Sequence, residues 1–89
     1  MYILDYSTQF KKDFKKITKM AIPDIIEVGN VIGSLQKEIS LDAKYVDHPL
    51  SGNWNGFRDC HIKPDLVLIY RTYEKTLQLA RIGSHSEVF

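Results

Sequence analysis

The sequence predicts an α+β domain with two layers, in which a two-helix hairpin packs on a mainly antiparallel four-stranded sheet. Two stretches with apolar residues at helical spacing lie before residue 40, and three short apolar segments separated by tight turns lie after residue 56. Two helices that each carry one apolar stripe must cover an apolar surface, and one face of a sheet supplies it. With a short strand at the start, the predicted order is β-α-α-β-β-β. The 89 residues fit one domain covering residues 1–89.

The composition is typical of a globular protein and excludes several classes. The chain is 44% hydrophobic and 26% charged, with a formal net charge of +1, which excludes a disordered or collagen-like chain. No apolar run approaches the ~20 residues of a membrane helix, so we expect no membrane partner. The N-terminal residues lack the pattern of a secretory signal, and Cys60 has no second cysteine to pair with. Both features predict a cytoplasmic protein.

The first strand and the first helix follow from the N-terminal third of the chain. Residues 2–6 are apolar and aromatic with partial alternation, which predicts a strand. Ser7 or Thr8 can cap the following helix. Its apolar stripe consists of Phe10, Phe14, Ile17 and Ala21. The opposite side carries Lys11, Lys12, Lys15, Lys16 and Lys19, for which a solvated basic face is the simplest interpretation.

A second helix begins near Pro23, because proline fits the first turn of a helix. Its stripe consists of Ile25, Val28, Ile32, Leu35 and Ile39. Residues 40–56 then break both periodicities, which predicts a loop of about 15 residues, unusually long for a small domain. We expect this loop to be ordered, with four apolar anchors on the core: Tyr45, Val46, Leu50 and Trp54.

Three predicted strands complete the domain, at residues 57–62, 66–72 and 76–82. The turns between them contain Pro64 and Asp65 in one case and residues 73–75 in the other, so the strands form an antiparallel meander. The segment 66–72 is the most apolar and is expected to be central. Residues 83–89 are predicted to form a polar tail that ends in an aromatic residue.

All three histidines lie in the second half of the chain, in loops or at strand ends: His48, His61 and His85. Any one of them alone is most simply a solvated polar residue. The meander, however, brings His61, Asp65 and the tail with His85 toward one edge of the sheet. Because imidazole titrates near neutral pH, a cluster of this kind suits proton transfer.

Other chemistries are open to the same residues. The three histidines, with Asp65 or Cys60, offer ligands for zinc, but their spacing matches no compact metal motif, so we rank this alternative lower. Cys60 is expected to be a small buried hydrophobe. Phe89 either packs into the core or stacks on a ligand. A pair of histidines beside an arginine suffices to cleave RNA, whose 2′-hydroxyl is the nucleophile, although composition alone does not lead uniquely to this reaction.

Residues 47–65 read DHPLSGNWNGFRDCHIKPD, and this stretch resembles the signature of YafQ-type toxins of the RelE/ParE superfamily. Residues 68–70 and 81–89 continue the likeness, which extends over the whole chain. The resemblance implies the toxin of a type II toxin–antitoxin system with a RelE-like fold. It further implies a metal-independent endonuclease that needs no cofactor and cuts mRNA in the ribosomal A site. An antitoxin is the implied protein partner, and DNA is reached only through that antitoxin.

The resemblance also implies the site residues. The catalytic positions fall on His48, His61, Asp65 and His85. The predicted RNA-binding residues are Arg81, Phe89, Arg58 and Lys63. The basic helix face from Lys11 to Lys19 is expected to contact ribosomal RNA through phosphates. The sequence departs from the family pattern at Leu66, where an aromatic residue is usual.

Two alternatives of other classes are considered. Relatives with the same fold bind gyrase without cutting RNA, and a degenerate toxin can act as an antitoxin-bound co-repressor. A gyrase-binding module has no need of three histidines and Asp65, whereas an endonuclease does. The constellation therefore favours the enzyme.

Overall fold

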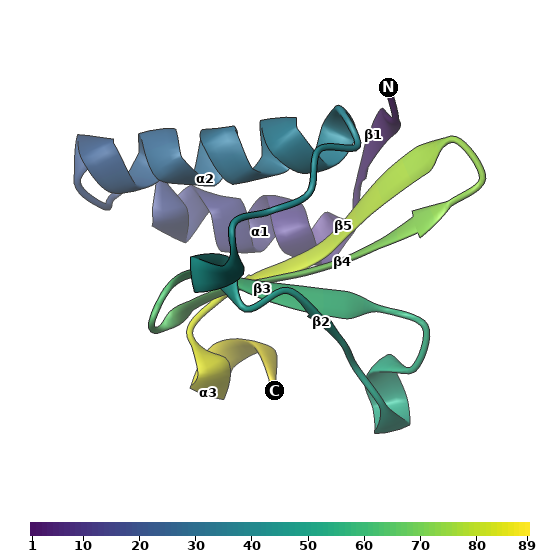
Figure 1. The fold of residues 1–89 in the computed structure, drawn as a ribbon. Helices are drawn as coiled ribbons and strands as arrows, with labels where there is room; N and C mark the ends of the chain where they lie inside the picture. The colour runs from purple at the N-terminus through teal and green to yellow at the C-terminus, as the bar shows by residue number, and fades with distance from the viewer.

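The computed structural model describes residues 1–89 as a five-stranded sheet with a helical layer on one face and a smaller layer on the other (Figure 1). The strands are β1 (Ile3–Tyr6), β2 (His48–Pro49), β3 (Arg58–Lys63), β4 (Leu66–Tyr73) and β5 (Thr76–Gly83). The α-helices are α1 (Thr8–Ile17), α2 (Ile22–Gln36) and α3 (His85–Val88). Two 3₁₀ turns, η1 (Ala43–Tyr45) and η2 (Gly52–Trp54), lie in the long loop. No helix combines the length and apolarity needed to cross a membrane.

The strand order is β1-β5-β4-β3-β2. The antiparallel meander of β3, β4 and β5 is confirmed. The predicted four-stranded sheet is wrong in detail, because a fifth strand, β2, pairs with β3 and β1 pairs with β5 in parallel. Two residues are too few to display an alternating pattern, so β2 was hidden within the predicted loop. Residues 83–89 were predicted as a polar tail without secondary structure, whereas the structure has a short helix there, α3.

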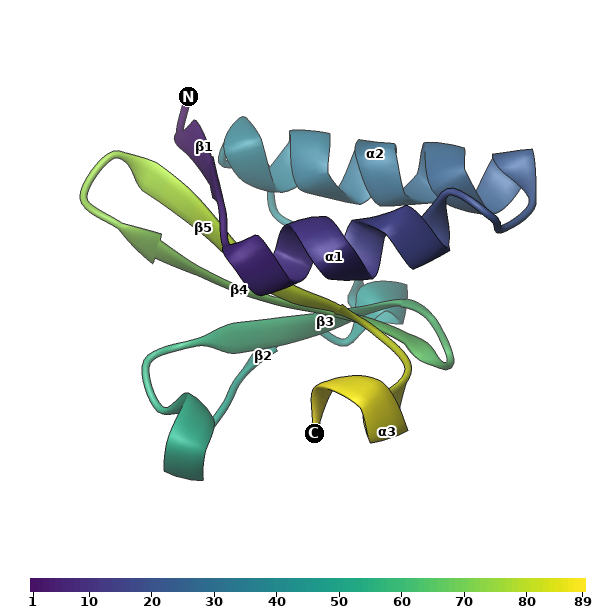
Figure 2. The same cartoon turned by 180° about the vertical axis from the view of Figure 1, so that it is seen from behind.

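The helices α1 and α2 cover one face of the sheet (Figure 2). The side chain of Ser7 starts α1 as predicted, because its Oγ accepts a hydrogen bond from the Phe10 N–H at 2.9 Å and donates one to the Ala80 carbonyl at 2.7 Å. The second helix ends earlier than its apolar stripe suggested, and Ile39 is exposed. The main core contains Phe10, Ile17, Val28 and Val31 from the helices and Leu68, Tyr70, Leu77 and Leu79 from the sheet.

The long loop and α3 cover part of the other face, where a second apolar cluster lies. Its members are Val67, Ile69 and Val88, with Leu50, Trp54, Phe57 and Ala80 packed against them. The Trp54 and Phe57 rings meet edge to face at 5.2 Å. The prediction of an ordered loop is therefore confirmed for Leu50 and Trp54, and Tyr45 packs on the main core. Val46 is no anchor, because it is 55% exposed.

Gly83, at the turn from β5 into α3, lies close to the helix. A Cβ atom at this position would lie 3.1 Å from Glu87 Oε1 and 3.4 Å from Val88 Cγ1, so a larger residue requires the Glu87 side chain to shift by a few tenths of an ångström. The Ser84 N–H donates a hydrogen bond of 2.9 Å to Glu87 Oε1, which closes the first turn of α3. The hydrogen bonds from the Ser84 backbone and side chain lower the pKa of Glu87.

A buried carboxylate, Asp13, connects the helical layer to β5. It accepts hydrogen bonds from Arg81 Nε at 2.8 Å, from the Ile82 N–H at 3.1 Å and from Gln9 Nε2 at 3.1 Å. Burial alone would raise the pKa of Asp13, but these hydrogen bonds and the charge of Arg81 together lower the pKa below its usual 3.8.

The substitution Asp13→Ala should destabilise the fold by roughly 3 kcal/mol, because it leaves the Arg81 guanidinium and the Ile82 N–H without their acceptor. In a domain of this size that corresponds to a drop in Tm of about 15 °C. Because the pKa of Asp13 is lowered in the folded state, its contribution is complete above the usual 3.8 and is lost as pH falls through the folded-state value. Thermal unfolding at pH 7 and at pH 3 should show the gap between wild type and variant narrowing in acid. An equal gap at both pH values contradicts this account; exposed Asp5→Ala is the control.

Candidate active site

Three imidazoles that are far apart in the chain form a row on the face of the sheet opposite α1 and α2. The ring centroids of His48 and His61 lie 6.1 Å apart, and those of His61 and His85 lie 5.0 Å apart. The Phe89 ring ends the row, 6.2 Å from His85. Phe89 is 56% exposed and so does not belong to the core. We call His48, His61 and His85 the imidazole row.

The Asp65 carboxylate fixes His85 at one end of the row. Asp65 Oδ1 lies 3.0 Å from His85 Nδ1 and accepts the His85 backbone N–H at 3.1 Å. These hydrogen bonds, the backbone one first, lower the pKa of Asp65. Since an ionised carboxylate only accepts, Nδ1 is the protonated nitrogen of His85, and Nε2 is left for a substrate.

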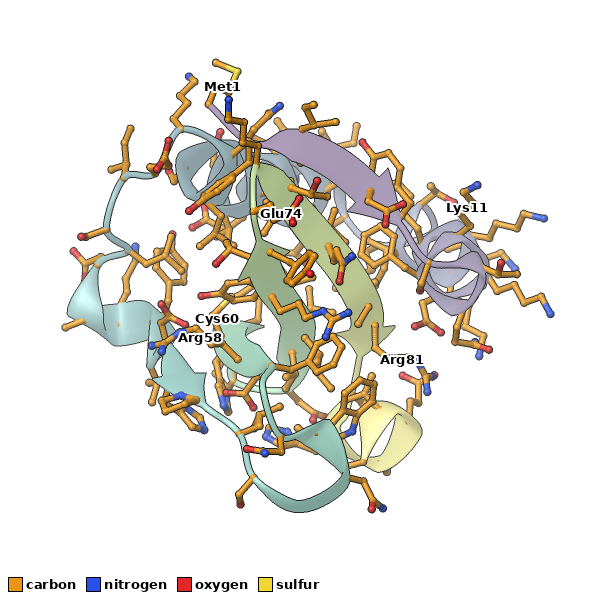
Figure 3. All side chains as sticks on the ribbon, turned by 90° about the vertical axis from the view of Figure 1, so that its right-hand side faces the viewer. Met1, Lys11, Arg58, Cys60, Glu74 and Arg81 are labelled. Carbon is orange, nitrogen blue, oxygen red and sulfur yellow. The ribbon has the colours of Figure 1, made fainter.

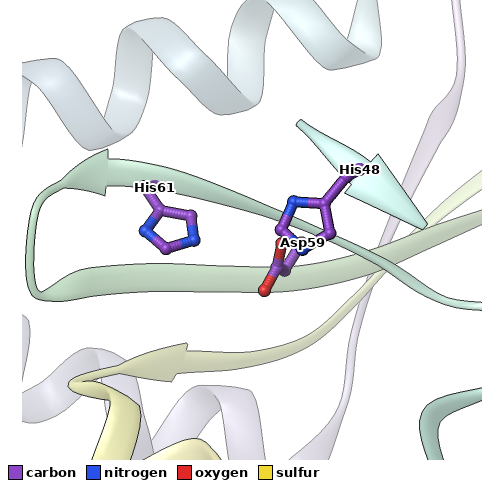
Figure 4. Close-up of side chains that lie close together, drawn as sticks. All are labelled: His48, Asp59 and His61. Carbon is purple, nitrogen blue, oxygen red and sulfur yellow. Dashed lines mark ion pairs between the residues drawn. The ribbon is translucent and has the colours of Figure 1, made fainter. Parts of the chain in front are cut away.

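A backbone carbonyl and a buried carboxylate hold His48 at the other end. His48 Nδ1 lies 2.8 Å from the Val46 carbonyl oxygen and 3.0 Å from Asp59 Oδ1. The carbonyl can only accept, so Nδ1 carries the proton and Nε2 is again left for a substrate. Asp59 is only 3% exposed and its Oδ1 accepts no hydrogen bond, so it is placed to pair with a protonated His48 (Figure 4).

Asp59 is a member of the site that was not predicted from the sequence. The signal was present, because Asp59 and His61 are two residues apart on one strand and therefore share a face. The strand β2, which places His48 directly opposite Asp59, could not be predicted from the sequence pattern. Without that pairing, Asp59 was only one of several aspartates near a histidine.

The same residues could hold a metal ion. One ligand atom each from His48, Asp59 and His61 lie within 4.8 Å of one another. Imidazole nitrogens with a carboxylate oxygen suit zinc or copper. This set differs from the zinc ligands considered from sequence, because Asp59 takes the place of Asp65 or Cys60 and His85 is not part of it. Cys60 is fully buried as predicted, and burial, followed by the charges of Asp47 and Asp59, raises the pKa of its thiol to about 12.

The predicted RNA-binding cations are engaged by carboxylates within the chain. Arg81 pairs with Asp13 and also donates to the Glu87 carbonyl of α3 at 3.1 Å. Lys63 Nζ lies 2.6 Å from an oxygen of Asp24. Their contact with RNA stays a prediction.

Arg58 lies on the face of β3 opposite to that of His61, because the two are three residues apart in a strand. Its Nε is 3.3 Å from Asp47 Oδ1, which also accepts the Tyr70 hydroxyl at 2.5 Å. Leu66, at the position where the family pattern has an aromatic residue, is buried in the main core. Neither residue belongs to the imidazole row.

The four lysines of α1, Lys11, Lys12, Lys15 and Lys16, and Lys19 in the turn after it are all exposed, as predicted. We call them the lysine face. Lys16 Nζ lies 3.5 Å from Glu87 Oε2, so the lysine face adjoins α3, the helix that carries His85. Figure 3 shows Lys11 and Arg81 toward the same side of the molecule, with α3 below Arg81.

Comparisons with known proteins agree with the fold and identify a family. A family model described as "Bacterial toxin of type II toxin-antitoxin system, YafQ" matches residues 2–89. The mRNA interferase toxin YafQ of Escherichia coli K12 is 38% identical over 87 residues, which are 97% of this chain and 94% of that protein. The Putative toxin YafQ of Haemophilus influenzae is 36% identical over 92 residues, covering 94% of this chain and 88% of that protein.

Solved structures of toxins are similar to this chain over its whole length. In the E. coli DinJ–YafQ complex, the matching chain has a TM-score of 0.87 at 37% identity and covers 100% of this chain and 99% of its own. A metal-bound toxin from Helicobacter pylori has a TM-score of 0.90 at 45% identity, with both chains covered completely. The family model and these relatives thus identify the chain as the toxin component of a type II toxin–antitoxin system. The chain belongs to the YafQ family.

The substitution Asp65→Ala should loosen α3, because it removes the acceptor for both the backbone and the ring of His85. Amide hydrogen exchange at Val88 and Phe89, whose N–H groups bond to Ser84 and His85, should become faster than in wild type. The global Tm should change little, since Asp65 is exposed. Unchanged exchange at these two amides contradicts a positioning role for Asp65; Asp5→Ala is the matched control.

Proposed function

We propose that this chain is an endoribonuclease that cleaves mRNA in the ribosomal A site, with the RNA 2′-hydroxyl as nucleophile and without a metal ion. The observation that supports this most directly is the imidazole row, in which two rings are held through Nδ1 by neighbouring groups, which leaves Nε2 of each for a substrate. The name of the E. coli relative, an mRNA interferase, supports the same substrate.

In the proposed reaction one imidazole takes the proton of the 2′-hydroxyl as this oxygen attacks the adjacent phosphorus. The bond from phosphorus to the 5′-oxygen breaks, and a second imidazole gives that oxygen a proton. The products are a 2′,3′-cyclic phosphate and a 5′-hydroxyl. We assign these two roles to His85 and His61, because their rings are only 5.0 Å apart and each step needs a group within reach of the phosphate.

His48 has the third role, stabilisation of charge. The phosphate gains negative charge in the transition state, and a cation beside it lowers the barrier. His48 in its protonated form is such a cation, and its Nδ1 lies 3.0 Å from the buried Asp59 carboxylate. Asp65 orients His85 in the same way as the acid of a catalytic triad orients its histidine. Phe89 offers a ring on which a base can stack.

We also propose that the lysine face contacts ribosomal RNA and that a cognate antitoxin is the protein partner in the cytoplasm. Five exposed lysines on one face next to α3 supply a sequence-independent contact to phosphates close to the imidazole row. The E. coli relative forms a complex with DinJ, which supports an antitoxin partner. DNA would be reached only through that antitoxin.

The substitution His85→Ala should lower the rate of mRNA cleavage by about 10²–10⁴-fold, the usual contribution of a positioned acid or base, at an unchanged Tm. The assay uses programmed ribosomes in their usual Mg²⁺ buffer, and the toxin is treated with EDTA and desalted before it is added. Ser86→Ala, an exposed change on the same helix, is the control. Wild-type rates in His85→Ala would remove His85 from the mechanism, and loss of cleavage by the EDTA-treated wild type that added zinc or copper restores would contradict a reaction without a metal ion in the toxin.

Charge reversal of the lysine face (Lys12→Glu, Lys15→Glu and Lys19→Glu together) should weaken ribosome binding and reduce its dependence on salt, because fewer counterions are released. Lys16 is kept, since it pairs with Glu87. Cosedimentation with ribosomes at several salt concentrations measures the effect. The variant with the same lysines changed to glutamine separates lost attraction from added repulsion. Ribosome binding equal to that of wild type would show that another surface makes the contact.

A further inference from the structure

A cleft opens beside the imidazole row, between α2, η1 and the β3–β4 turn. Its volume is about 580 Å³, and its lining includes Glu27, Lys44, Tyr45, Val46, His61 and Lys63. Small-molecule sites typically measure about 300–1,000 Å³, so a nucleobase fits. His61 belongs both to the cleft and to the imidazole row. A phosphate that lies at the row therefore has one of its neighbouring nucleotides next to this cleft. We call it the Tyr45 cleft.

Val46 adopts a conformation that packing does not explain. Its φ angle is +51°, in the left-handed region, which β-branched residues rarely adopt. Its side chain is 55% exposed, so the strain is not offset by burial of that side chain. In this conformation the Val46 carbonyl meets His48 Nδ1 at 2.8 Å, and the side chain lines the cleft. Strained backbone at such a position points to a role in binding or catalysis.

The polar side chains that line the Tyr45 cleft supply a hydrogen-bond acceptor and a cation. The Tyr45 hydroxyl donates to Glu27 Oε1, which holds the carboxylate in place and leaves Oε2 available as an acceptor. Lys63 is paired with Asp24, which leaves the ammonium of Lys44, 5.1 Å from the Tyr45 ring centroid, as the cation of the cleft that no carboxylate engages. An apolar side chain, a fixed carboxylate and a cation can contact the face, the edge and the phosphate of one nucleotide.

We propose that the Tyr45 cleft binds the base of a nucleotide next to the scissile phosphate and selects bases that carry an exocyclic amino group. A carboxylate accepts from the exocyclic amino group of cytosine, adenine or guanine, and uracil has no such group but a carbonyl oxygen in its place. Uracil would leave two acceptors facing each other, so it is disfavoured. The proposal rests on the proposed endonuclease function and deepens it by assigning specificity to Glu27.

The main experiment maps cleavage sites in an mRNA pool by sequencing the new 5′ ends, with wild type, Glu27→Gln and Glu38→Gln. In wild type we expect uracil to be depleted about tenfold at one position next to the cut, which corresponds to the lower part of the range for one base contact. Glu27→Gln keeps the size of the side chain but adds a donor, so it should restore uracil at that position. Glu38→Gln, at a distant exposed carboxylate, should match wild type. Depletion that Glu27→Gln leaves unchanged overturns the proposal.

The variant Val46→Gly tests the strained residue. Glycine adopts a positive φ freely, so the Tm should stay the same or rise, whereas cleavage should fall because the contact to the base is lost. A parallel loss of Tm and cleavage would make Val46 a structural residue and contradict its place in the cleft.

A binding measurement separates failure of the cleft from failure of the endonuclease proposal. Titration of the wild-type protein with CMP and with UMP, followed by amide NMR shifts, should give shifts at Tyr45, Val46 and His61 at lower concentrations of CMP. Cleavage without base preference, together with equal shifts for both nucleotides, overturns the cleft and leaves the endonuclease intact. Absence of cleavage with CMP-selective shifts retains the cleft as a nucleotide site and rejects the endonuclease.

Discussion

The buried Asp13 carboxylate joins the helical layer to the strand that leads into the site. It receives hydrogen bonds from Arg81 and from the Ile82 backbone, and Arg81 in turn donates to the Glu87 carbonyl of α3. A movement of α1 relative to β5 would therefore also move α3, which carries His85. The arginine that resembles a phosphate ligand in the sequence thus has a structural role that the sequence does not display. The Arg81–Asp13 ion pair therefore joins α1 to β5 and, through the Glu87 carbonyl, helps to position α3.

Two carboxylates in different surroundings contact the imidazole row. Asp65 is exposed and supports His85, whereas Asp59 is almost fully buried and faces His48. A charge beside a buried carboxylate interacts with it more strongly than a charge beside an exposed one. His61, between them, has no carboxylate hydrogen bond of its own. The three imidazoles therefore lie in three different electrostatic surroundings.

Most of the fold followed from periodicity, because α1, α2 and the three long strands each span several repeats of their pattern. The sequence also indicated which histidines meet, because turns and strand order determine which chain segments share an edge. Three features could not be predicted from the sequence, each for a physical reason. The strand β2 has two residues, the helix α3 has four, and the exposure of Val46 depends on a backbone angle that composition does not encode. Asp59 was overlooked as a consequence, since only β2 brings it to His48.

The close approach of α3 to Gly83 affects when a growing polypeptide acquires a complete site. His85 enters the row only when β5 has paired with β4 and the α3 turn has closed on Gly83, and both of these elements are synthesised after His48 and His61. A nascent chain on its own ribosome that has not yet released residues 84–89 from the exit tunnel lacks one imidazole and the Phe89 ring. Under the proposed mechanism such an intermediate lacks one of the two acid–base groups, so cleavage begins only after translation of the chain is finished.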